Sequence, residues 1–159
     1  MTIAAIFIWT AWVAMPAGAV PSDGPPDACG LLPKIDIERA AGTQVGEGKP
    51  HRHIPLVTRF VYTGAGGAQV AILMRRIDRP EWAAGQVTRM EKGVKLGTYR
   101  ETTGIGGRSF FLDAGKTSSV LCVFRDDLYL QISQVRSANA AANPLDLESL
   151  ARKALIAAR

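Results

Sequence analysis

The chain has 159 residues, of which 47% are hydrophobic and 21% are charged. This composition is typical of a globular protein and excludes the low-apolar, highly charged composition of disordered chains. The length suits one domain with a buried core and leaves no room for a second domain. The formal net charge is +5, which fits anionic partners but serves solubility equally well.

The N-terminus has the features of a secretory signal peptide. Residues 3–15 form an almost uninterrupted apolar run, followed by a proline and by the small-residue stretch Ala-Gly-Ala at 17–19. A membrane anchor would need about 20 apolar residues, and the small residues suit a signal peptidase that cleaves after Ala19. We therefore expect residues 1–19 to be removed, no transmembrane anchor in the mature chain, and a periplasmic or secreted protein.

The two cysteines, Cys29 and Cys122, predict one disulfide bond. Export would bring both into an oxidising compartment, where a single pair leaves no free thiol. In the chain-entropy model, closing a loop of roughly 90 residues would stabilise the fold by about 4 kcal/mol. A zinc site built on the same cysteines is disfavoured, because they form no C-x-x-C and the two histidines lie in a separate loop.

Residues 20–28 combine three prolines with a glycine and two acids, which predicts a flexible, extended lead-in. The folded domain is therefore expected over residues 29–159. Pro33 suits the first turn of a short helix, and Gly42 suits the left-handed residue that ends it. A polar loop is expected over residues 43–55.

Two longer helices are expected further along the chain. Pro80 begins the first and Gly97 ends it. In the second, Asn143 is the expected N-cap and Pro144 the first helical residue. Both helices have an apolar stripe at helical spacing: Ala83, Val87, Met90 and Val94 in the middle helix, and Leu147, Leu150, Ala151, Ala154 and Leu155 in the C-terminal helix.

The strands are predicted by runs of β-branched and aromatic residues that turn residues separate. They are expected at residues 56–63, 69–77, 98–103, 109–113, 119–125 and 128–136. The glycine-rich stretches at 64–67 and 104–107 supply turns; the second matches no phosphate-binding motif. The predicted fold class is α+β, with an antiparallel sheet of five or six strands on which a short N-terminal, a middle and a C-terminal helix pack.

The last hairpin turns at Asp126 and Asp127. A two-residue turn sets two apolar pairs on one face of the sheet, Leu121 opposite Ile132 and Val123 opposite Leu130, and leaves Cys122 on the other face. We expect the N-terminal segment with Cys29 to cover that second face. A three-residue turn is the alternative, and it would put Cys122 on the face of Leu130.

Few residues indicate catalysis. His51 and His53 could both ligate a metal, but a site needs a third ligand, and a solvated loop is the simpler interpretation. The motifs of serine hydrolases and zinc hydrolases do not occur in the sequence. We expect no cofactor, and an enzyme is disfavoured.

Basic residues occur in three groups: Lys49, His51 and Arg52; Arg75, Arg76 and Arg79; and Arg89, Lys92 and Lys95. Together they could form a surface for phosphates or anionic polymers, and ordinary solvated faces explain them equally well. The candidate anion-binding residues are Arg75, Arg76, Arg79, Arg89 and Lys92. Nucleic acid is disfavoured as the partner, because the protein is expected to be exported.

Several segments resemble small uncharacterised exported bacterial domains, a group that includes lipoproteins. The resemblance is carried by the opening Cys-Gly-Leu-Leu-Pro at 29–33, Gly104-Ile105-Gly106-Gly107 with Phe110, the last hairpin, and Leu150, Ala154 and Leu155 of the closing helix. It implies a fold akin to the PsbP-like α+β sandwich. It implies no reaction, because the members of this group are largely of unknown function.

These observations give three hypotheses for function. The first is an exported, non-catalytic protein that binds another protein or a cell-envelope component through a sheet face or the groove beside the middle helix. The second is a metal-dependent or hydrolytic enzyme that uses the loop with His51 and His53. The third is a module that binds anionic polymers. The sequence leaves the ligand and the oligomeric state open.

Overall fold

The computed structural model describes residues 28, 30–51, 56–113, 118–136 and 144–158. Within them, seven strands form one antiparallel sheet in the order β1-β2-β3-β7-β6-β5-β4. The elements in chain order are α1 (Lys34–Ala41), β1 (Lys49–Pro50), β2 (Val57–Thr63), β3 (Gln69–Arg76), α2 (Pro80–Lys95), β4 (Tyr99–Thr102), β5 (Arg108–Asp113), β6 (Ser118–Arg125), β7 (Leu128–Val135) and α3 (Pro144–Ala157).

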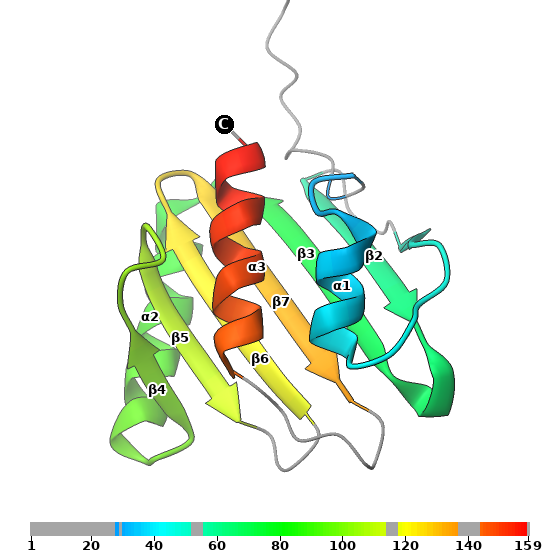
Figure 1. The fold of residues 1–159 in the computed structure, drawn as a ribbon. Helices are drawn as coiled ribbons and strands as arrows, with labels where there is room; N and C mark the ends of the chain where they lie inside the picture. The colour runs from blue at the N-terminus through cyan, green and yellow to red at the C-terminus, as the bar shows by residue number, and fades with distance from the viewer. Residues whose placement is uncertain (1–27, 29, 52–55, 114–117, 137–143, 159) are drawn as a thin grey trace, which may run out of the picture.

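The helices divide between the two faces of the sheet (Figure 1). Helices α1 and α3 lie side by side on one face, where α1 contacts β3 and β7 and α3 contacts β6 and β7. Helix α2 lies on the opposite face, near the β4 edge. The predicted α+β class with three helices on an antiparallel sheet is confirmed.

The predicted number of strands is too low. The additional strand, β1, lies in the stretch 43–55, which was expected to be a polar loop, and it pairs with β2. It consists of Lys49 and Pro50 only, and both are exposed. Two exposed residues show no alternation of polar and apolar side chains, which is the pattern that identifies a strand.

Proline and glycine set the helix boundaries, as expected. Pro33 directly precedes α1, and Gly42 ends it in the left-handed region at φ 70°, which glycine adopts without steric cost. Pro80 is the first residue of α2 and Pro144 the first of α3. The predicted cap of α3, Asn143, lies outside the described residues.

The register of the last hairpin follows from a two-residue turn. Asp126 has a φ of 51°, a conformation that aspartate tolerates and that tight hairpin turns require. The predicted pairs are confirmed, with Leu121 opposite Ile132 and Val123 opposite Leu130. Cys122 therefore points to the other face of the sheet.

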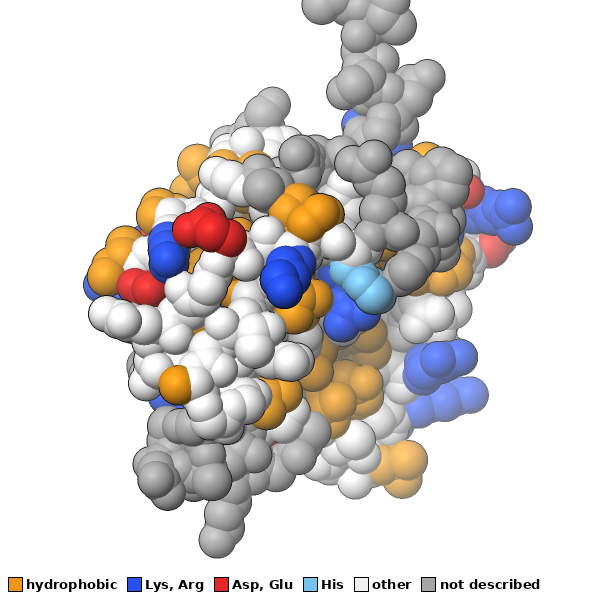
Figure 2. Space-filling view, turned by 90° about the vertical axis from the view of Figure 1, so that its right-hand side faces the viewer, with side chains coloured by type: hydrophobic (Ala, Val, Ile, Leu, Met, Phe, Trp, Pro, Cys, Tyr) orange, Lys and Arg blue, Asp and Glu red, His pale blue; other side chains and the backbone are white. Residues whose placement is uncertain are grey.

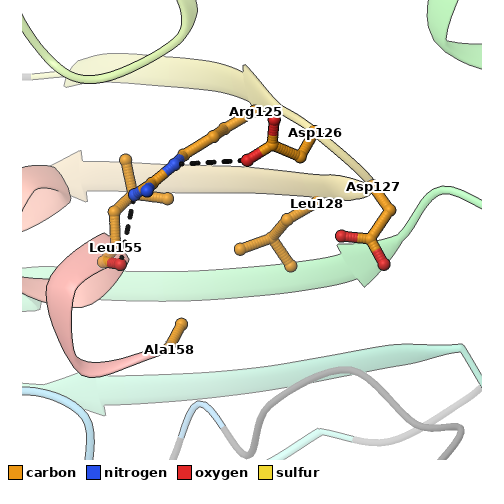
Figure 3. A pocket seen from close by; sticks show the side chains of 6 residues that line it. All are labelled: Arg125, Asp126, Asp127, Leu128, Leu155 and Ala158. Atoms are coloured by element: carbon orange, nitrogen blue, oxygen red, sulfur yellow. Dashed lines mark hydrogen bonds and ion pairs between the residues drawn. The ribbon is translucent and has the colours of Figure 1, made fainter.

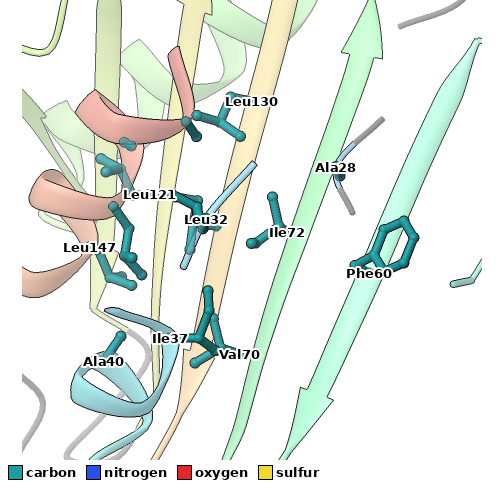
Figure 4. Close-up of a cluster of buried hydrophobic side chains, with 14 of the residues drawn as sticks. Ala28, Leu32, Ile37, Ala40, Phe60, Val70, Ile72, Leu121, Leu130 and Leu147 are labelled. Carbon is teal, nitrogen blue, oxygen red and sulfur yellow. The ribbon is translucent and has the colours of Figure 1, made fainter. Parts of the chain in front are cut away.

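The larger hydrophobic core lies between the sheet and the pair α1 and α3 (Figure 4). The inward side chains of the central strands meet the apolar stripes of both helices there. Its members include Ile37, Val70, Ile72, Leu121, Leu130, Ile132, Leu147 and Leu150, each at most 2% exposed. The expected apolar stripe of the C-terminal helix is confirmed, since all five of its residues are buried in this core.

The smaller core lies beneath α2. It contains Met90, Phe110, Cys122, Phe124 and Tyr129, and the half-buried residues of the α2 stripe pack against it. The ring of Tyr129 lies 4.9 Å from that of Phe124, centroid to centroid. Its hydroxyl lies 2.8 Å from Oε1 of Gln131 and 3.3 Å from Sγ of Cys122. Burial raises the pKa of Tyr129, so the phenol stays protonated and can donate.

The predicted disulfide bond between Cys29 and Cys122 is not found, and that expectation is corrected. Cys122 is a free, buried cysteine. Cys29 lies outside the described residues, but its neighbour Ala28 is buried in the core on the side of α1 and α3. Cys122 belongs to the core on the opposite side, and it is α2, not the N-terminal segment, that covers it. Ala28 and Cys122 therefore lie on opposite sides of the sheet.

The burial of Cys122 predicts an unreactive thiol. Desolvation by burial raises its pKa, an effect that the hydrogen bond with Tyr129 partly offsets, and alkylation requires an exposed thiolate. We expect iodoacetamide to modify Cys122 in the folded protein slower by roughly a hundredfold or more than in guanidinium. Mass spectrometry of the peptide that contains Cys122 measures both rates. Full labelling in guanidinium without reductant is expected; labelling that requires reductant would contradict a free thiol.

Two glycines give a matched test of the packing. A Cβ at Gly107 would run into the backbone carbonyl oxygen of Phe124, whereas a Cβ at exposed Gly85 in α2 would meet nothing within 4 Å. We expect Gly107→Ala to destabilise the fold by about 1–3 kcal/mol, because backbone has to shift. Gly85→Ala should stabilise it by about 0.5–1 kcal/mol, because alanine favours the helix. Urea unfolding measures both, and equal midpoints would refute the described packing.

Candidate functional site

Helix α2 covers only part of its face of the sheet. On β2, β3, β6 and β7 the side chains that alternate with those of the main core point to the α2 side. Those beside and beyond the base of α2 form a continuous patch, which we call the open sheet surface: Val61, Ala71, Leu73, Val120, Gln131 and Ser133. All are half-buried except Ala71, whose small side chain is 8% exposed.

The strand register joins these residues into rows across the sheet. Val61 lies opposite Ala71, which lies opposite Ser133, which in turn lies opposite Val120. Leu73 lies opposite Gln131 in the next row. Leu73 and Val120 also pack against the core beneath α2, so the open sheet surface continues to the base of this helix.

Cations without partners gather on this side of the molecule. Five described Lys and Arg side chains take part in no ion pair or hydrogen bond, and we call them the unpaired cations: Lys49, Arg59, Arg89, Lys92 and Lys95. Lys49 lies opposite Val61 and Arg59 opposite Leu73, so both point to the α2 face. The other three lie at three-residue spacing on the exposed side of α2.

The space-filling view shows how charge and apolar surface lie together. In Figure 2 hydrophobic side chains are recessed to the right of the centre. A histidine lies above the recess, with Lys and Arg side chains next to it, and further Lys and Arg side chains lie at the right of the recess. An apolar floor with positive charge on both sides can receive a ligand that is apolar on one side and anionic at its flanks.

The structure divides the candidate anion-binding residues into two groups. Arg75 and Arg79 pair with Asp78, at 3.4 and 3.7 Å, and Arg76 pairs with Asp127 at 3.7 Å. The guanidinium of Arg75 also lies 4.1 Å from the ring centroid of Trp82, so this group joins β3 to the start of α2. The second group, Arg89 and Lys92, is exposed on α2 and belongs to the unpaired cations.

A cavity of about 300 Å³ lies between α2 and the β4 edge, lined by Glu91, Val94, Lys95, Glu101 and Arg108. Arg108 lies 2.6 Å from Glu91 of α2 and 3.3 Å from Glu101 of β4. The hydrogen bond with Glu91 is the main cause that raises the pKa of Arg108, and the bond with Glu101 adds to it. Both carboxylates are therefore engaged by one guanidinium, which ties α2 to the sheet.

A second cavity, of about 100 Å³, lies between the last hairpin and the end of α3 (Figure 3). Arg125 extends along it, donates from Nη1 to the carbonyl oxygen of Leu155 at 3.3 Å and pairs with Asp126 at 3.6 Å. A basic side chain at this position satisfies a free carbonyl at the end of a helix. The aspartates of the turn are exposed, as expected for turn residues.

A third cavity, of about 120 Å³, lies between α1 and α3, beside Asp36 and Arg39. Asp36 is buried and pairs with Lys153 of α3 at 2.6 Å and with Arg39 at 3.4 Å. Such partners offset the cost of removing a carboxylate from water. The cluster therefore joins the two helices.

Of the two histidines in the metal-site hypothesis, the structure describes only His51. His51 is exposed, and its backbone N–H donates to the carbonyl oxygen of Arg59 at 2.7 Å, which extends the pairing of β1 with β2. His53 lies outside the described residues. Within the part of the chain that the structure describes, no three His, Cys, Asp or Glu side chains come close enough to hold a metal ion.

Arg59 was not among the expected site residues. Its orientation follows from alternation in β2, since Phe60 and Tyr62 are buried on the other face. Its lack of an acidic neighbour, however, depends on the pairing of strands far apart in the sequence. In the sequence, only the alternation of side chains along β2 could have indicated the orientation of Arg59.

Among the described residues, no helix is long and apolar enough to cross a membrane. No protein-family model matches the chain, and no curated protein has significant sequence similarity to it.

Proposed function

We propose that this is an exported, non-catalytic protein that binds another protein or a cell-envelope component through the open sheet surface. The observation that carries the proposal is the position of this surface: half-exposed apolar side chains on rigid strands, next to the unpaired cations. Apolar surface of this kind, with a charged rim, is typical of protein interaction sites.

Binding through the sheet face fits the structure better than binding through a sheet edge. A partner strand would need a free edge with unpaired backbone groups. One edge is β1, which has two residues and includes Pro50; the other is β4, which has four residues and exposes Arg100 and Glu101. Short strands, proline and charged residues are the features that protect an edge from pairing.

The cavities described above do not compete with this surface. Each of them contains an ion pair that joins neighbouring elements, across α2 and β4, at the last hairpin or between α1 and α3. These pairs hold elements together. The unpaired cations beside the open sheet surface, in contrast, are available to a ligand.

A photo-crosslinking experiment tests the binding surface. The crosslinking residue p-benzoylphenylalanine replaces Ser133, in the centre of the open sheet surface, or Ile156, which is 68% exposed on α3. On irradiation of producing cells, we expect a discrete crosslinked product from position 133 and none from position 156, because only the first lies on the α2 face. The same product from both positions, or none from position 133, would refute the proposal.

A separate experiment tests export. Cells that produce the chain are fractionated, and the N-terminal sequence of the protein is determined in each fraction. We expect the protein in the periplasm or medium with Val20 as its first residue, since a signal peptidase would cleave after Ala19. A product that retains Met1 in the cytosolic fraction would contradict this part of the proposal.

A further inference from the structure

We infer that the ligand of the open sheet surface is an acidic, amphipathic helix of a partner protein. The inference rests on the proposed function and names the chemistry of its partner. It combines three properties of the described residues: the width of the uncovered strands, the apolar floor and the positions of the unpaired cations.

The uncovered strands offer a track for one helix. Neighbouring strands lie about 4.8 Å apart, so β2, β3 and β7 together span roughly 10 Å, which is the diameter of an α-helix with its side chains. On the opposite face, β3 and β7 already receive α1. Of the described helices, α1 and α3 lie on that face and α2 lies on the other (Figure 1), so the same strands present a second helix position that no described element occupies.

The floor of this track requires an apolar stripe on the ligand. Val61, Ala71 and Leu73 lie at its centre, and Val120 continues it toward α2. A fully hydrophilic polyanion would leave these side chains in water. Burying them is favourable by about 25 cal/mol for each Å² of apolar surface that is removed from water. A ligand with apolar residues at helical spacing therefore gains the most binding free energy.

The flanks of the track require negative charge on both sides of that stripe. Lys49 and Arg59 lie on the β1–β2 side, and Arg89 and Lys92 lie on α2. Lys95 also lies on α2, but it lines the cavity at the β4 edge. On this face Asp78 binds Arg75, and Glu91 and Glu101 both bind Arg108. Glu81, in the first turn of α2, is exposed and forms no ion pair with a described residue, so the unpaired cations outnumber the unpaired acids. A helix with acidic residues on both edges of its apolar stripe would pair with both groups of cations.

Peptide probes test the inference directly. The acidic probe is a fluorescein-labelled 18-residue helix of Leu and Glu with the Leu residues on one face, titrated with the purified protein by fluorescence anisotropy. The matched probes are the same peptide with Lys in place of Glu, and a scrambled Leu and Glu peptide without an apolar face. We expect binding of the acidic amphipathic probe alone, and weaker binding as the salt concentration rises.

Protein variants locate the binding. Arg59→Gln combined with Lys92→Gln should weaken the acidic probe by roughly fivefold or more, because each removes one exposed ion pair. The control, Lys34→Gln combined with Arg100→Gln, makes the same change in net charge on the face of α1 and α3, where these residues pair with Glu47 and Glu148, and should leave binding unchanged. Ser133→Glu should place a negative charge at the centre of the track and abolish binding of the acidic probe, with the fold checked by circular dichroism.

Several results would overturn the inference. They are failure of the acidic probe to bind, equal binding of the basic or scrambled probe, and equal loss in the control variant. Binding of phosphatidylglycerol vesicles with the same sensitivity to the variants, but not of the peptide, would assign the surface to a membrane instead. If the probe fails while Ser133 still gives its specific crosslink, the acidic helix is refuted and the proposed function stands; if the crosslink also fails, both are refuted.

Discussion

Alternation of side chains along β7 and its neighbours is the constraint on which the rest of the structure depends. In β7, Leu130 and Ile132 enter the core beneath α1 and α3, while Tyr129 enters the core beneath α2. A slip of one residue would exchange these sets and expose the larger core to water. The tight turn at Asp126 prevents such a slip, because it determines which residues of β6 and β7 face each other.

The two faces differ in how they use charge. On the side of α1 and α3, ion pairs such as Asp36 with Lys153 join one element to another. On the other side, Arg108 does the same for α2 and β4, but the unpaired cations remain beside a strip of half-exposed apolar residues. Among the described residues, the basic side chains without a partner therefore lie on the side where the sheet is less covered.

Much of the fold could be predicted because single residue types decide the local backbone. Gly42 ends α1 and Pro80 begins α2, as their backbone preferences require. The alternation of the last two strands predicted their register. Strand β1 was missed because its two residues, one of them Pro50, lack both alternation and strand preference.

The candidate site could be predicted less well, because it depends on packing between distant elements. Local patterns showed that Cys122 lies on the second face, but not that α2 would cover it. The expected disulfide was wrong for that reason. Likewise, the charge of Arg76 is evident from the sequence, whereas its pairing with Asp127 is not. Such pairing decides which basic residues remain available to a ligand.

The free thiol at Cys122 has a consequence for the order of events in maturation. Since no sulfur bond through this residue has to be made, the sheet and both cores can form in a reducing environment as soon as synthesis ends. If the chain is exported as proposed, a translocation channel that accepts only unfolded chains would have to receive it before it folds. The timing of recruitment to the channel, rather than an oxidant, would then limit the yield of mature protein.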